Sequence, residues 1–225
     1  METEESTQTT PHLSPEELRV LGVLSEKGLA TPQNYPLSLA AVVTGCNQAS
    51  NREPVVDYDE GTVREALSAL NKRGLVAEQT GAGSRVAKFR TQLARTYRLT
   101  AAQETLVAGL MLRGPQTVGE LRGRWKRMHE FESLEDVSAQ LDALMAWEPP
   151  LVVSLAQVPG ERGERFAHTF APVEEGAAPT TSSVPSSLSG TLQEQIDAQA
   201  ERIEGLEAEL ADLRAEFDTF RTQFE

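Results

Sequence analysis

The sequence predicts a mainly helical α+β protein in which one small module occurs twice, followed by a flexible linker and a coiled coil. Three patterns support this. A helix-opening pattern repeats, a β-hairpin pattern closes each copy, and a heptad repeat fills the end of the chain. These patterns divide the chain into a disordered tail (1–12), two modules (13–96 and 97–171), a linker (172–190) and a coiled-coil helix (191–225).

The repeated helix reads LSPEELRVLGVLSEKG in the first copy and LTAAQETLVAGLMLRG in the second. Each begins with a hydroxyl residue followed three places later by Glu or Gln, which predicts a capping box. Each ends with a basic residue in the last turn and a glycine, which favour a helix stop. The matched pairs are Ser14 and Thr100, Glu17 and Gln103, Lys27 and Arg113, and Gly28 and Gly114.

A second helix and a β-hairpin complete each copy. The helix is predicted from apolar residues at spacing i, i+4, i+7, which are Val63, Leu67 and Leu70 in the first copy and Val137, Leu141 and Leu144 in the second. Asp59 and Ser133 are its predicted N-caps. A short helix fits before it, at 37–44 and 118–127, and a hairpin follows it, within 75–90 and 151–170. This order predicts two tandem winged helix-turn-helix domains.

Composition is that of an ordinary globular protein, with 39% hydrophobic and 24% charged residues. No apolar run approaches 18 residues, and the start of the chain has no leader-like pattern, so we expect no membrane partner. The single cysteine, Cys46, excludes an internal disulfide and favours a reducing, cytoplasmic location. We expect it to be a small buried residue.

The net charge of −13 would argue against nucleic-acid binding if it were spread evenly over the chain, but it is not. After residue 171 the chain has 12 acidic and 3 basic residues, whereas the first module has 9 acidic and 10 basic residues. The overall charge therefore does not exclude a local DNA-binding face.

In a winged-helix protein that reads DNA, the third helix enters the major groove and the wing contacts phosphates. The first module offers basic candidates on this helix and on the wing, which are Arg64, Lys72, Arg85 and Lys88. Asp59, Glu60 and Glu65 oppose them in the first half of the helix. A solvated basic face and a DNA-binding face both fit this pattern.

The corresponding helix of the second module has Glu135, Asp136 and Asp142 and no basic residue, so its insertion between phosphates would be repulsive. Any contact there must come from the preceding segment, where the candidates are Arg122, Arg124, Lys126 and Arg127. Trp125 and Met128 lie among them, and indicate either a partner surface or the module's core.

One polar block has no counterpart in the second module. Its candidates for contacts to bases or to a partner's backbone are Asn47, Gln48, Asn51 and Arg52. The alternative is that these residues cap helices and fix a loop.

Catalysis has little support, and we expect neither an enzyme nor a cofactor or metal. His12, His129 and His168 are far apart in sequence, and no nucleophile or metal-ligand spacing is present. Gly81–Gly83 fits a wing turn better than a phosphate-binding loop.

Four segments are distinctive: TPQNYPLS, CNQASNREPV, RGPQTVGELRGRWKRMHEF and PGERGERFAHTF. Through these segments the chain resembles the YceH-type family of uncharacterised bacterial proteins, over about residues 13–171. The resemblance implies a tandem winged-helix fold. It supplies no catalytic residue.

Beyond the linker, apolar residues follow at alternating steps of four and three, which predicts a parallel homodimeric coiled coil. The predicted dimerisation residues are Leu192, Ile196, Ile203, Leu206, Leu210, Leu213, Phe217, Phe220 and Phe224. The alternative is a helix that folds back onto its own modules.

Two functions therefore remain open. The first is a DNA-associated, regulator-like binding protein. The second is a protein–protein interaction scaffold of tandem winged-helix domains, held together by the coiled coil. Retention on DNA resin that is lost at moderate salt would favour the first function.

Overall fold

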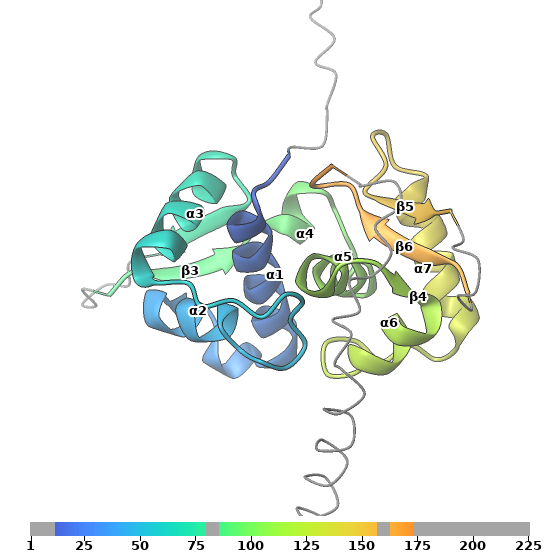
Figure 1. Cartoon of the computed structure of the whole chain (residues 1–225), viewed down its shortest axis with the longest axis horizontal. Helices are drawn as coiled ribbons and strands as arrows, with labels where there is room; N and C mark the ends of the chain where they lie inside the picture. The colour runs from blue at the N-terminus through green and yellow to red at the C-terminus, as the bar shows by residue number, and fades with distance from the viewer. Residues whose placement is uncertain (1–11, 80–85, 157–162, 173–225) are drawn as a thin grey trace, which may run out of the picture. The chain divides into compact units, whose positions relative to one another are not determined.

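The computed structural model describes residues 12–79, 86–156 and 163–172, all of which lie in one compact unit bounded by Met1 and Gly176. The unit is α+β, with two copies of one arrangement (Figure 1). The predicted coiled coil, nearly all of the predicted linker and N-terminal tail, and the wing-turn glycines lie outside the described residues. No described helix has the length and apolar character needed to cross a membrane.

Each copy, here called a repeat, runs helix, short strand, helix, helix and hairpin. The first consists of α1 (Pro15–Ala30), η1 (Pro32–Asn34), β1 (Leu37–Ser38), α2 (Leu39–Cys46), α3 (Glu60–Lys72), β2 (Val76–Gln79) and β3 (Lys88–Thr91). After the short α4 (Leu93–Thr96), the second consists of α5 (Ala101–Arg113), β4 (Gln116–Thr117), α6 (Val118–Arg124), α7 (Leu134–Met145), β5 (Val152–Leu155) and β6 (Arg165–His168).

Each repeat contains a three-stranded antiparallel sheet, with strand order β1-β3-β2 in the first and β4-β6-β5 in the second. The two-residue strands pair at Leu37 with Phe89 and at Gln116 with Phe166. The hairpins were predicted, but these third strands were not. Two residues are too short to show the alternation that marks a strand.

Local capping signals set the helix starts. Both predicted capping boxes form, at Ser14 and Thr100, and Asp59 and Ser133 cap α3 and α7. The predicted short helices are close to α2 and α6 but not identical to them: α2 begins two residues late because Leu37–Ser38 pair as β1, and α6 ends at Arg124.

The two predicted glycine stops have different outcomes. Gly114 caps α5 with φ 71°, as predicted. The prediction at Gly28 is wrong, because α1 continues to Ala30 and the Thr31 N–H donates to the Lys27 carbonyl. A Cβ on Gly28 would lie 3.2 Å from the Tyr35 ring, so this glycine instead gives the ring room against the helix.

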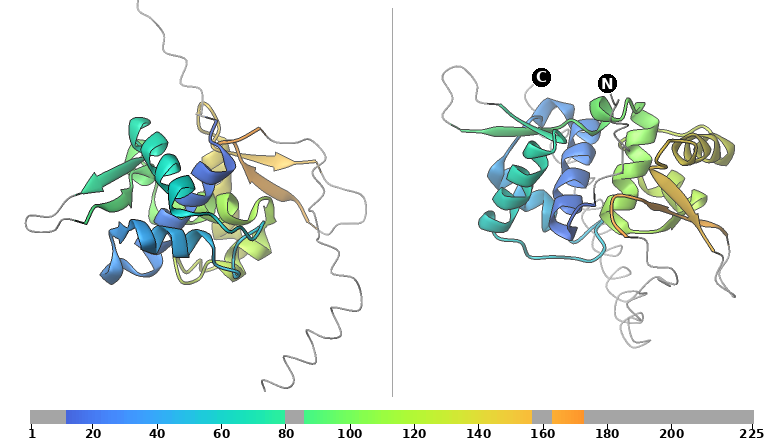
Figure 2. Two further views of the ribbon diagram at one scale, coloured as in Figure 1. Left: turned by 60° about the vertical axis from the view of Figure 1, so that its left-hand side comes forward. Right: turned by 90° about the horizontal axis from the view of Figure 1, so that it is seen from above.

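The two repeats pack through α1 and α5, which lie side by side in both views (Figures 1 and 2). Their approach is close: a Cβ on Gly22 would lie 2.9 Å from the Leu112 side chain. The Glu53 N–H donates to the Leu112 carbonyl at 2.8 Å, and the Leu13 N–H donates to the Phe170 carbonyl at 2.7 Å. The predicted division at residues 96 and 97 stays a prediction, since both repeats belong to one compact unit.

A glycine faces a larger side chain inside each repeat, but on opposite helices. In the first repeat the glycine is Gly45 of α2, where a Cβ would lie 2.6 Å from Val23 of α1. In the second it is Gly109 of α5, where a Cβ would lie 2.5 Å from the Trp125 indole nitrogen. Val23 and Gly109 occupy the same position in the repeated helix. In each repeat, therefore, the glycine of one helix complements the larger side chain of its neighbour, and the two repeats do not share this arrangement.

Candidate nucleic-acid interface

Helix α3 presents a polar face outward and an apolar face inward. Val63, Leu67 and Leu70 are buried, as their spacing predicted. The outer side is exposed: toward the hairpin it carries Arg64, Ser68, Asn71 and Lys72, and Glu60 and Glu65 are exposed on the same helix. The helix packs on α1 and α2, so this polar face is directed away from the core (Figure 1).

A groove of about 380 Å³ separates the outer face of α3 from the β2–β3 hairpin. Its lining is partly apolar and partly polar. The lining residues are Arg64, Leu67, Ser68, Asn71, Lys72, Glu78, Ala87 and Phe89. Thus four of the polar residues of one helix face share a groove with the hairpin.

The charges around this groove are mixed. Among the described residues, the exposed Lys72 and Lys88 form no ion pair, whereas Arg64 pairs with Glu60 one turn earlier. Asp59 is occupied as the cap of α3, where its carboxylate accepts the Thr62 N–H at 2.7 Å. That hydrogen bond holds the pKa of Asp59 below its usual range. Arg85 lies outside the described residues.

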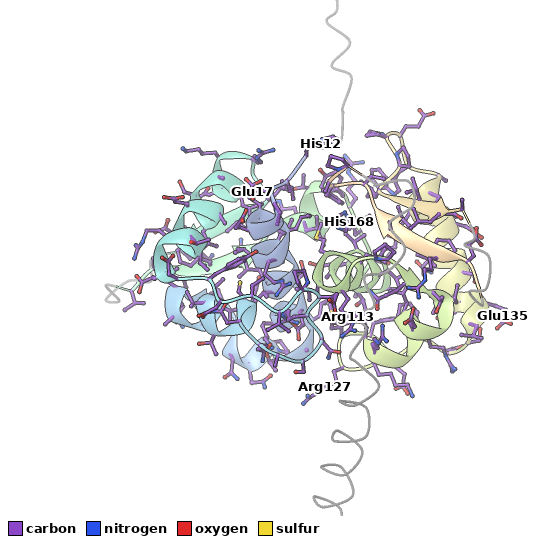
Figure 3. All side chains as sticks on the ribbon, viewed as in Figure 1. His12, Glu17, Arg113, Arg127, Glu135 and His168 are labelled. Atoms are coloured by element: carbon purple, nitrogen blue, oxygen red, sulfur yellow. The ribbon has the colours of Figure 1, made fainter. Side chains whose placement is uncertain are left out.

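The equivalent face in the second repeat is acidic. Glu135 and Asp142 are exposed on α7, and Figure 3 places Glu135 at the outer edge of this repeat. The basic residues of the preceding segment are partly engaged within the repeat. Arg122 donates to the Glu132 carbonyl at 2.8 Å, and Arg124 pairs with Glu120 at 3.1 Å.

Lys126 and Arg127 are exposed, and Arg127 lies at the lower edge in Figure 3. The residues interleaved with them are core residues, because Trp125 is 2% and Met128 is 9% exposed. Of the two interpretations of Trp125 and Met128, the structure supports the core and not the partner surface.

The polar block of the first repeat is built into the fold, and Arg52 is its centre. Arg52 is 2% exposed and donates to the carbonyls of Gly45 at 3.0 Å and Asn51 at 2.9 Å. It also donates to Gln48 at 2.9 Å and to the Glu26 carboxylate at 2.5 Å. Its guanidinium is therefore not exposed to a base or a partner, which corrects its place among the binding candidates.

Two neighbours of Arg52 also act within the fold. The Asn47 side chain donates to the Tyr58 carbonyl at 2.9 Å and accepts the Tyr58 N–H at 2.8 Å, which closes the loop between α2 and α3. Gln48 accepts from Lys27 at 3.0 Å. Asn51 has φ 56°, in the left-handed region that asparagine tolerates. The structure favours the loop-fixing alternative for this block.

Sequence reasoning missed Arg19, which serves the same loop from α1. It is 4% exposed and donates to the carbonyls of Cys46 at 3.0 Å and Pro54 at 2.5 Å. Burial, and then the nearby Arg52, lowers the pKa of Arg19. The only available signal was a basic residue within an apolar helix face. Cys46 is buried as predicted, and burial raises the pKa of its thiol to about 11, which makes it a poor nucleophile.

Comparison with known proteins decides the family. Residues 13–161 match the family described as "Protein of unknown function, DUF480". The chain belongs to the DUF480 family. Its relatives include a UPF0502 protein of Azoarcus sp. (strain BH72), 43% identical over 95% of this chain and 94% of the relative. The UPF0502 protein YceH of Salmonella paratyphi B is 43% identical over 92% of this chain and 95% of the relative. The resemblance to the YceH-type family is therefore confirmed.

Proposed function

We propose that the two repeats are tandem winged-helix domains and that the protein is a non-enzymatic, DNA-associated binding protein. The observation that carries this proposal is the groove in which Arg64, Ser68, Asn71 and Lys72 of α3 face the hairpin. A third helix beside a two-stranded hairpin is the arrangement in which winged-helix proteins place one element in the major groove and the other near phosphates.

The residue types on α3 fit this role. Arginine and asparagine can each make two hydrogen bonds to a base edge, arginine to guanine and asparagine to adenine. Arg64 and Asn71 lie two turns apart on the same side of the helix. Lys72 and Lys88 are suited to phosphates, since an exposed lysine acts as a point charge. We assign base contacts to the first pair and backbone contacts to the second.

This proposal gives the two repeats different roles. Glu135 and Asp142 on α7 would repel the phosphates that Lys72 and Lys88 attract. The first repeat therefore makes the principal DNA contact. The acidic α7 face favours the second candidate function, a protein-interaction scaffold, because a DNA duplex is excluded from that face and a basic protein surface is not.

Replacing Lys72 and Lys88 together with alanine is expected to weaken binding to a random duplex and to lower the salt dependence. Because two phosphate contacts are lost, the slope of log K against log salt should decrease by about 2. Fluorescence anisotropy over a salt series measures both quantities. The matched control is the Lys126→Ala, Arg127→Ala double variant, which removes the same charge from the other repeat. Equal effects of the two double variants would contradict the placement of the site, and no binding by the natural chain would contradict the DNA proposal.

We also propose that the chain forms a parallel homodimer through the heptad repeat of residues 191–225. The support is the sequence pattern, since this segment lies outside the described residues. A homodimer would present two first repeats to one duplex, which raises the effective concentration of the second contact once the first has formed.

A further inference from the structure

A buried carboxyl group lies at the junction of the two repeats. Glu104 belongs to α5, which packs on α1, and it is only 6% exposed. Its Oε1 atom is buried and has no hydrogen-bond partner among the described residues. An ionised carboxylate in such a place is costly, because burial removes its hydration and no hydrogen bond to Oε1 replaces it.

Hydroxyl groups of the first repeat lie next to this carboxyl. The Ser25 side chain of α1 is close enough to Glu104 to lower the pKa of its carboxyl through hydrogen bonding. The Ser25 hydroxyl donates to the Thr91 hydroxyl oxygen at 3.2 Å, and the Thr91 N–H donates to the Tyr35 hydroxyl oxygen at 2.5 Å. A hydrogen bond that lowers the pKa of a carboxyl favours its ionised form, so Ser25 offsets part of the cost of ionising Glu104.

We propose that Glu104 is a proton-operated latch between the two repeats. With its proton, the carboxyl is neutral and stays buried between α5 and α1 without an uncompensated charge. Without the proton, it places an uncompensated negative charge between the helices and weakens their packing. The tightness of the junction then depends on pH and increases as the pH falls.

Few charged groups on the elements around α5 are placed to compensate Glu104. On α1, Arg19 is bound to the carbonyls of Cys46 and Pro54, and Lys27 is bound to Gln48 and Glu26. Among the described residues, no ion pair involves Glu104. An ionised Glu104 would thus have no cationic partner among them.

The remaining titratable neighbours do not change this conclusion. Tyr35 is close enough for Glu104 to raise its pKa, and Arg90 of β3 acts on the same tyrosine in the opposite direction. On β6, burial lowers the pKa of His168 to about 4, so that imidazole is neutral near pH 7, and Arg165 reaches the Pro115 carbonyl and Glu120. On α4 the arginine, Arg95, is exposed, and the acidic residues Glu135 and Asp142 of α7 are also exposed.

The direction of the pH effect follows from the pKa. Burial raises the pKa of Glu104 above its usual value of 4.5, and the influence of Ser25 opposes part of that rise. The folded chain therefore keeps a proton that the unfolded chain has already released. As the pH rises from the unfolded pKa through the folded pKa, the folded state loses stability relative to the unfolded state.

The test compares the full chain with Glu104→Gln, which keeps the shape of the side chain and cannot ionise. Between pH 5 and pH 8, the melting temperature of the natural chain should fall about 2–4 °C further than that of the variant. The exposed Glu130→Gln variant is the matched control and should follow the natural chain. Amide hydrogen-exchange protection of α1 and α5 should show the same pH dependence and lose it in Glu104→Gln.

A second variant has an effect of the opposite sign. Since Ser25 lowers the pKa of Glu104, the Ser25→Ala variant should increase the difference in melting temperature between pH 5 and pH 8. In the Glu104→Gln background, the same change should leave the pH dependence unaltered. The proposal is overturned if the natural chain and Glu104→Gln share one pH profile, or if Ser25→Ala changes the profile equally in both backgrounds.

Discussion

The Arg52→Ala variant is expected to lose about 3–5 kcal/mol of its free energy of unfolding. The guanidinium is fully buried, and its removal leaves the carbonyls of Gly45 and Asn51 without this donor and leaves Glu26 paired, among the described residues, with Lys27 alone. Loss of a buried ion pair together with its hydrogen bonds is among the most destabilising single changes. Denaturant unfolding followed by circular dichroism measures the loss.

The matched control for this prediction is Arg64→Ala, which also removes an arginine from an ion pair. The Arg64 side chain is 66% exposed, so we expect a change of about 0.5 kcal/mol or less. The control separates the effect of burial from the effect of losing an ion pair. A loss below about 1 kcal/mol in Arg52→Ala would show that the loop does not depend on the guanidinium.

Reversing three charges in the heptad segment is expected to dissociate the proposed homodimer. In a parallel in-register pair, Arg202 faces Glu207, Glu209 faces Arg214, and Glu216 faces Arg221 of the other chain. Changing the three arginines to glutamate turns all six symmetric pairs repulsive. If each pair changes from an attraction of roughly 0.3–0.5 kcal/mol to a repulsion of the same size, the free energy of dimerisation becomes less favourable by about 4–6 kcal/mol. Sedimentation velocity at micromolar concentration should then show monomers.

The reciprocal variant changes Glu207, Glu209 and Glu216 to arginine and should also remain monomeric. Mixing the two variants restores every attraction, so the mixture should sediment as a heterodimer. Monomers in the mixture, or dimers in either variant alone, would contradict parallel in-register pairing. A natural chain that is itself monomeric would favour the alternative in which the helix folds back.

The helices could be predicted because their signals are local. Capping boxes at Ser14 and Thr100 involve residues three apart, and apolar spacing marks the buried side of α3 and α7. The third strand of each sheet could not be predicted, since its pairing partner is about 50 residues away at Leu37 and Phe89. The glycine at 28 was misinterpreted because its role depends on the Tyr35 ring.

In the candidate site, too, features set by local sequence could be predicted and contacts between distant residues could not. The exposed positions of α3 follow from helical spacing, and Arg64 and Lys72, which were predicted on this helix, are exposed there. Arg52 lies in the loop between α2 and α3 and pairs with Glu26 of α1, and no pattern within the polar block indicates that contact. Glu104 was likewise indistinguishable from an exposed helix residue in the sequence.

The glycines at the helix crossings limit how the two repeats can exchange sequence. Recombination that copied α1 over α5 would replace Gly109 with valine, at a position where even a Cβ would lie 2.5 Å from the Trp125 ring. The reverse copy would put a glycine opposite Gly45 and leave a void in place of Val23. Either product has a defective core. The two repeats therefore cannot exchange these helices freely, which leaves their third helices free to differ in charge: α3 has two acidic and two basic residues, and α7 has three acidic residues and no basic one.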